Sequence, residues 1–276
     1  IRLSNICNMK CRTCNSHYSS MWEHEDSRQG MKIIGIDKNV RSDYLQEILP
    51  HIQYMDMAYF AGGEPLIMDE HYNILDELDR RGRYDVVLIY NTNFSETRLK
   101  DRSVFEYWKL FDSVSVGASL DGAEEYAEYI RKGTDWNQVE RNRVEMLKIC
   151  PQVDFYISPT LSILNALHLP DFHQDWVDRG FIQAQDLNVN ILQDPMHFRI
   201  DIAPSEYKAE LSTVYLNHIQ WLREQGDDLG RATQGFESAI TFMNATDNTH
   251  LIDQFWRKTH ELDDIRNENV LDVIPE

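Results

Sequence analysis

The chain has 276 residues, a length that suits one large α/β domain or one domain with a small appendage. Its 27 basic and 46 acidic side chains give a formal net charge of −19 at pH 7, which argues against nucleic acid as the main partner, because phosphate binding requires clustered cations. No apolar run approaches the roughly 18 residues that cross a bilayer, so we expect no membrane span and no membrane partner.

Short β-rich segments alternate with longer segments whose apolar residues recur at helical spacing. We predict strands at residues 1–4, 55–60, 84–90, 113–120, 153–161 and 186–192. We predict helices at 40–52, 71–81, 103–111, 137–149, 169–179 and 205–224, and further helical structure from 235 to about 264. We expect the helical segment 236–255 to cover the open side of the fold. Six strand–helix units imply parallel strands joined by crossovers, in a sheet covered on both faces. The fold class is therefore α/β, with a core at 1–200 and a C-terminal helical extension at 201–276 that packs on it.

The four cysteines are unevenly placed. Cys7, Cys11 and Cys14 form a C-x₃-C-x₂-C loop after the first predicted strand, while Cys150 stands alone. A secreted disulfide framework would scatter its cysteines and pair them, so the clustered thiols indicate metal ligation in a reducing compartment, which we take to be the cytoplasm. A [4Fe–4S] cluster normally takes four cysteines, so three would leave one iron open for chemistry.

The alternative for the cysteine triplet is a zinc site completed by His17 or His24. Structural zinc usually takes two ligand pairs from separate segments, often as C-x₂-C. A C-x₃-C-x₂-C triplet without a distant second pair matches that pattern poorly, so we favour the cluster.

A second motif ends the second predicted strand. Gly62 and Gly63 would let the backbone approach a ligand closely, Glu64 can accept a hydrogen bond from an ammonium group, and Pro65 stiffens the following turn. Taken alone, this segment is better interpreted as a β-turn. Its position one strand after the cysteine loop makes it a candidate binding motif.

At these two motifs the chain resembles the radical S-adenosylmethionine (SAM) superfamily, whose members carry a C-x₃-C-x₂-C loop after strand one and a Gly-Gly-Glu motif at the end of strand two. The resemblance covers residues 1 to about 195. It implies a (β/α)₆ partial TIM barrel with C-terminal helices, a [4Fe–4S] cluster on Cys7, Cys11 and Cys14, and SAM on the fourth iron. The backbone of Gly62 and Gly63, together with Glu64, would then hold the SAM amino group.

Further positions match the family pattern and are implied SAM contacts. Thr92 and Asn93, at the end of the third strand, stand where relatives carry a Thr-Asn segment near SAM. Ser119 opens a Ser-Leu-Asp-Gly segment similar to that of peptide-modifying and sulfatase-maturating members, in which the serine contacts SAM. Arg131 stands where those members have an arginine on the SAM carboxylate, and a guanidinium–carboxylate fork is geometrically sound. Leu192, near the end of the sixth strand, would pack on the adenine.

The chain departs from the family pattern in several places. Thr13, before the third cysteine, replaces an aromatic or bulky residue beside the adenine, so that only its backbone would contact SAM. A glycine-bearing motif of the sixth strand is missing. Residues 4–22 and the C-terminal segment resemble twitch- or SPASM-type members, but Cys150 alone cannot hold their auxiliary cluster. Either that cluster lies upstream of Ile1 or there is none, and we expect Cys150 to be a buried free cysteine at a helix end.

Other polar residues have ordinary interpretations. His168, Asp171, His173 and Asp175 could be metal ligands, but we expect them on a solvated helix face. A second group on or after the fifth strand could point into a substrate cavity; it consists of Tyr156, Ser158, Thr160 and Asn165.

The sequence therefore predicts a radical SAM enzyme, an oxidoreductase that cleaves SAM reductively to methionine and a 5′-deoxyadenosyl radical, which abstracts hydrogen from a substrate. The resemblance favours a peptide or protein substrate over a small metabolite, and implies a low-potential electron donor such as flavodoxin or ferredoxin. The alternative from another class is a non-catalytic iron–sulfur or zinc module. A deazaguanine-type small-molecule enzyme is a third alternative, although such enzymes have a longer spacing between their first two cysteines.

Overall fold

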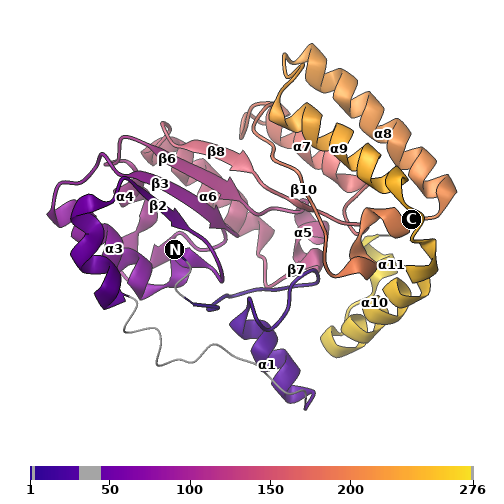
Figure 1. The fold of residues 1–276 in the computed structure, drawn as a ribbon, viewed down its shortest axis with the longest axis horizontal. Coiled ribbons are helices and arrows are strands. Elements are labelled where there is room, and N and C mark those ends of the chain that lie inside the picture. Colours follow the sequence, from indigo (N-terminus) through magenta and orange to yellow (C-terminus); the bar gives the residue numbers. More distant parts are fainter. Residues whose placement is uncertain (2–3, 31–44, 275–276) are drawn as a thin grey trace. The chain divides into compact units, whose positions relative to one another are not determined.

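The computed structural model describes residues 1, 4–30 and 45–274 (Figure 1). The chain forms two compact units. Unit 1 consists of Ile1–Ser119 and Lys132–Phe155, and unit 2 of Leu120–Arg131 and Tyr156–Glu276. The expected boundary at residue 200 lies inside unit 2, so the division into a core and a helical extension stays a prediction.

A four-stranded sheet organises unit 1. Its strand order is β2-β3-β6-β8, with β2 at Met57–Phe60, β3 at Val87–Thr92, β6 at Val114–Ala118 and β8 at Asp154–Ile157. β2 and β3 run parallel, as do β3 and β6, which confirms the crossover connections expected from the sequence. β8 begins in unit 1 and ends in unit 2.

Unit 1 also contains several helices and shorter elements. The α-helices are α1 (Ser20–Arg28), α3 (Asp69–Arg80), α4 (Val104–Trp108) and α6 (Trp136–Ile149); the shorter elements are β1 (Lys10–Cys11), η1 (Leu49–Tyr54), η2 (Pro65–Ile67), β4 (Arg98–Leu99) and β5 (Arg102–Ser103). In β3, Leu88 and Tyr90 are fully buried, whereas Ile89 is half-buried and Asn91 is exposed. The two faces are therefore covered unequally, which differs from the predicted cover on both.

Unit 2 is mainly helical. It contains α5 (Glu124–Ile130), β9 (Thr160–Leu161), α7 (His168–Asp178), β10 (Asn190–Ile191), η3 (Met196–Phe198), η4 (Ile200–Ile202), α8 (Ser205–Glu224), α9 (Arg231–Ala245), η5 (Thr249–Leu251), α10 (Ile252–Arg266) and α11 (Val270–Val273), while β7 (Arg131–Lys132) lies across the boundary. β9 and β10 pair in parallel, and Ile157 forms a parallel bridge with Leu187. One core cluster lies under the C-terminal helices and includes Leu164, Leu192, Phe198 and Phe255.

Several predicted elements differ from the structure. Residues 2–3 of the first predicted strand and 40–44 of the first predicted helix lie outside the described residues, but the carbonyl of Ile1 accepts a hydrogen bond from Ala61 N (3.2 Å), beside β2. The helix expected over 236–255 is interrupted after Ala245. There the Asp247 carboxylate accepts hydrogen bonds from the main chain and hydroxyl of Thr249, which offers the backbone an alternative to the helix.

The strands of the described residues form one four-stranded sheet and three two-stranded sheets. A mixed α/β fold with a parallel sheet is therefore established, and the six-stranded partial barrel stays a proposal. No helix among the described residues is long and apolar enough to cross a membrane.

Candidate cofactor site

The cysteine loop (residues 5–16) is held by the start of α1. The Ser20 hydroxyl accepts a hydrogen bond from Cys7 N (3.2 Å), and the Trp22 indole donates to the Cys11 carbonyl (2.9 Å). The Ser19 hydroxyl donates to the Met9 carbonyl (2.7 Å) while it also caps α1 by accepting from the Trp22 main chain. The first turn of α1 therefore fixes three points of the loop.

All three cysteines of the loop are half-buried, and none of them forms a disulfide. Burial, together with the neighbouring Cys11, raises the pKa of the Cys7 thiol to about 12. No three His, Cys, Asp or Glu side chains in the described part of the chain converge as ligands of one metal ion. In a [4Fe–4S] cluster each cysteine would take a separate iron. The cluster and the zinc alternative both stay predictions at this loop.

The Gly62-Gly63-Glu64 turn (the GGE turn) packs directly against the cysteine loop. Glu64 N donates a hydrogen bond to the Ile6 carbonyl (2.7 Å). Gly62 and Gly63 both have positive φ values, of 83° and 58°. A Cβ on Gly63 would lie 2.2 Å from the Ile6 carbonyl oxygen, so only glycine permits this approach.

The Glu64 carboxylate organises the turn. It is 1% exposed and accepts hydrogen bonds from Leu66 N (3.0 Å), the Thr92 hydroxyl (2.7 Å) and Asn93 N (2.6 Å). Glu64, Thr92 and Asn93, three of the predicted SAM contacts, therefore lie together. An ionised carboxylate has about four acceptor positions, and these donors take three of them. The contact of Glu64 with an ammonium group stays a prediction, while its structural role is plain.

A polar network links the end of β3 to the cysteine loop. The Asn93 amide donates to the Asn8 side-chain oxygen (2.8 Å), and the Asn8 amide donates to the Ser95 hydroxyl (2.9 Å). Ser119, which follows β6, donates its main-chain N–H to the Thr92 carbonyl (2.7 Å). Unit 1 therefore gathers the cysteine loop, the GGE turn and the residues after β3 and β6.

Gly133 was missed by sequence reasoning. Its φ is 111°, and a Cβ there would lie 2.7 Å from the Asn8 carbonyl oxygen. It supports the cysteine loop from the segment before α6. Thr13 lies in the turn of this loop and is half-buried, and the main chain of Cys14 donates to the Cys11 carbonyl (3.0 Å).

In unit 2, Arg131 forms its fork with a protein carboxylate. Its Nε and Nη2 atoms lie 2.8 and 3.0 Å from the two oxygens of Asp121, which is 0% exposed. Asp121 also accepts a hydrogen bond from Thr160 N (2.7 Å), and its carbonyl accepts from the Asn165 amide (2.8 Å). The contact predicted between Arg131 and the SAM carboxylate stays a prediction. Asp121 supplies the carboxylate on this fork.

The other predicted residues of unit 2 are mostly engaged in packing. Leu192 is 6% exposed within the core cluster. The Asn165 side chain is fully buried and closes the turn after β9, and Ser158 accepts a hydrogen bond from the Asn190 amide (2.9 Å). The guanidinium of Arg231 lies over the Tyr156 ring at 4.3 Å. Tyr156 and Thr160 are half-buried. Their role in a substrate cavity stays a prediction.

The expected solvated helix face at α7 is wrong for two histidines. His173 is fully buried and its Nδ1 lies 3.0 Å from Nε2 of His218. His168 is half-buried, stacks on Tyr126 and accepts a hydrogen bond from Ala123 N (3.1 Å). Cys150 is 1% exposed at the end of α6, as predicted.

No protein-family model and no curated protein matches the chain. Among solved structures, the chain is similar to one described as native anSMEcpe with bound AdoMet (S-adenosylmethionine), with a TM-score of 0.50 and 24% identity over 82% of this chain and 59% of that one. It is also similar to native anSMEcpe with bound AdoMet and a peptide, with a TM-score of 0.53, 24% identity and the same coverage. The likeness establishes the fold, and the chain spans 59% of the length of these neighbours.

Proposed function

We propose that this chain is a radical SAM enzyme acting on a peptide or protein. In this proposal Cys7, Cys11 and Cys14 hold a [4Fe–4S] cluster, and SAM binds beside the GGE turn. The remaining proposed SAM contacts are Thr13, Thr92, Asn93, Ser119, Arg131 and Leu192.

One observation carries the proposal. The cysteine loop and the GGE turn are distant in the sequence, yet their main chains meet through the hydrogen bond from Glu64 N to the Ile6 carbonyl. The glycine at position 63 keeps that approach open, since any side chain there would strike the loop. A metal-binding loop against a main-chain cradle without side chains is the arrangement that a metal-bound ligand with polar main-chain contacts needs.

The residues present fit the cofactors. Three cysteines on one loop supply thiolates for three irons and leave the fourth for a non-protein ligand. When bound and reduced, the cluster would supply the electron that cleaves SAM, and the resulting 5′-deoxyadenosyl radical would take a hydrogen atom from the substrate.

The chain's own residues hold the cysteine loop and the GGE turn in place. Glu64 fixes the positions of Thr92 and Asn93, and Asn93 in turn anchors the cysteine loop through Asn8. These buried contacts keep the loop and the turn in one geometry before any ligand arrives, which reduces the entropy lost on binding.

The peptide substrate is supported by the Ser-Leu-Asp-Gly segment and by the neighbour solved with AdoMet and a peptide. We also propose a low-potential electron donor such as flavodoxin or ferredoxin, because reductive cleavage needs an outside electron. A small metabolite is the second candidate substrate.

Anaerobic reconstitution with iron and sulfide tests the cluster assignment. The native chain should bind about four irons, Cys11→Ala should lose most of them, and Cys150→Ala, the matched control, should keep them. Full iron content in Cys11→Ala would remove this residue from the site. Stoichiometric zinc in the chain purified without added metal, together with failure to take up iron, would favour the non-catalytic module.

A further inference from the structure

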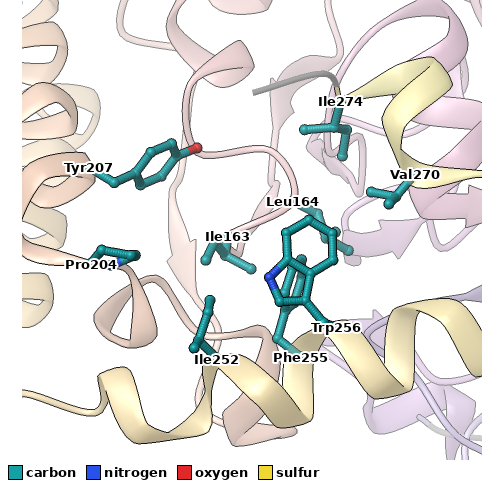
Figure 2. Close-up of a pocket in the computed structure, with 9 residues that line it drawn as sticks. All are labelled: Ile163, Leu164, Pro204, Tyr207, Ile252, Phe255, Trp256, Val270 and Ile274. Carbon is teal, nitrogen blue, oxygen red and sulfur yellow. The ribbon is translucent and has the colours of Figure 1, made fainter.

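A pocket of about 210 Å³ opens in unit 2, and none of the residues that line it is among those assigned above (Figure 2). Ile163 and Leu164 line it from the loop after β9, and Ile252, Phe255 and Trp256 line it from α10. Its other walls come from the start of α8 and from the segment around α11. Among the residues that the structure describes, the lining includes no charged side chain, and Tyr207 and Trp256 contribute its polar side-chain atoms.

The inner wall of the pocket is formed by buried core residues. Leu164, Phe255 and Val270 are 2%, 6% and 2% exposed, and all three belong to the core cluster of unit 2. The buried carboxylate of Asp263 accepts hydrogen bonds from the Tyr129 hydroxyl and from Val270 N, both at 2.9 Å, and so ties α10 to α5 and α11. The hollow is therefore bounded by packed core rather than by loosely placed side chains.

The outer rim is accessible to solvent. Trp256 is 38% exposed, and Ile163, Ile252 and Ile274 are half-buried. A group can thus enter the pocket while the rest of its molecule stays in water. The volume exceeds the roughly 150 Å³ of an apolar cavity that binds benzene and is below the roughly 300 Å³ at which drug-sized pockets begin. It suits one compact apolar group.

We propose that this pocket binds a single apolar side chain, aromatic or branched aliphatic, of a peptide ligand. The identification of the ligand as a peptide rests on the proposed function, whereas the apolar selectivity rests on the lining alone. The open rim favours a tethered group over a free hydrocarbon, because the peptide main chain would remain solvated outside. The pocket would then select for the type of side chain at one position of the peptide.

Fluorine NMR of the cofactor-free full chain tests this with N-acetyl-4-fluorophenylalaninamide as the probe. The probe should bind, N-acetyl-leucinamide should displace it, and the glycine and lysine analogues should not. Ile252→Trp, which fills the pocket from its rim, should weaken binding by about tenfold or more. Ile265→Trp, on the exposed side of the same helix at 43% exposure, should change it by less than about twofold.

A second measurement serves in case Ile252→Trp fails to fold. In the chain labelled with 5-fluorotryptophan, the Trp256 resonance, assigned with Trp256→Phe, should shift on probe addition. Equal weakening by both tryptophan variants, an unmoved Trp256 resonance at saturation, or binding of toluene without any capped amino acid would overturn the proposal. The binding measurement needs no cofactor, so it can succeed even if the chain does not cleave SAM. Probe binding without SAM cleavage would therefore support this inference while the proposed function fails.

Discussion

Replacement of Glu64 by glutamine should destabilise unit 1 strongly, although it changes only one atom of the side chain. The carboxylate accepts from two main-chain N–H groups, Leu66 N on one oxygen and Asn93 N on the other. Whichever way a glutamine amide is turned, its NH₂ group faces one of these donors. One buried N–H therefore loses its acceptor, and the bonds that remain lose their charge assistance.

The magnitude follows from these contacts. An unsatisfied buried donor costs about 1–3 kcal/mol, and weakening the remaining bonds adds roughly 1 kcal/mol, so we expect a loss of about 2–4 kcal/mol in the free energy of unfolding. At about 2–4 °C per kcal/mol for a chain of this size, the Tm should fall by roughly 5–15 °C.

Thermal melting of the cofactor-free chain, followed by circular dichroism, measures this effect. Glu96→Gln makes the same chemical change at an exposed position near the same loop and should shift the Tm by less than about 2 °C. If Glu64→Gln has the same Tm as the native chain, Glu64 does not hold the turn as described.

Three further predictions follow from single contacts. Gly63→Ala should lower the Tm far more than Gly82→Ala. Both sites have positive φ, but only a Cβ at position 63 would lie 2.2 Å from the main chain of the cysteine loop. Equal losses of Tm would contradict this packing. Burial lowers the pKa of His71 from 6.5 to about 3, so the unfolded chain binds the proton first and stability should fall as the pH drops from 6.5 towards 3. Urea unfolding between pH 7 and 4 measures how steeply the free energy of unfolding falls with pH. His71→Leu should make this dependence weaker, and an unchanged dependence in that variant would argue against a buried neutral imidazole. Asp121→Asn should cost about 3–5 kcal/mol in urea unfolding, because it breaks a buried pair, and a loss below about 1 kcal/mol would argue against the fork.

The parts of the fold that the sequence predicted are those with local signals. The apolar segment 84–90 predicted β3, and the helical spacing over 205–224 gave the bounds of α8 as the structure has them. The GGE turn was identified because glycine pairs are scarce in this chain and this one follows a strand. Each of these signals lies within a few residues of the element that it predicts.

The parts that the sequence did not predict depend on distant partners. No role was predicted for Asp121, because its partner Arg131 lies beyond α5, a helix that was not predicted from the sequence. His173 suggested a solvated face, because its partner His218 is 45 residues further along the chain. No sequence motif around Gly133 indicated its close approach to the cysteine loop. Packing between distant segments has no signature in local spacing.

The central claim is that the cysteine loop and the GGE turn form one site for cluster-dependent SAM cleavage. The most direct measurement is mass spectrometry of 5′-deoxyadenosine after anaerobic reconstitution and addition of dithionite and SAM, with and without short peptides. We expect 5′-deoxyadenosine and methionine from the native chain and neither from Cys11→Ala. A native chain with about four irons that forms no 5′-deoxyadenosine, even with peptides present, would contradict it.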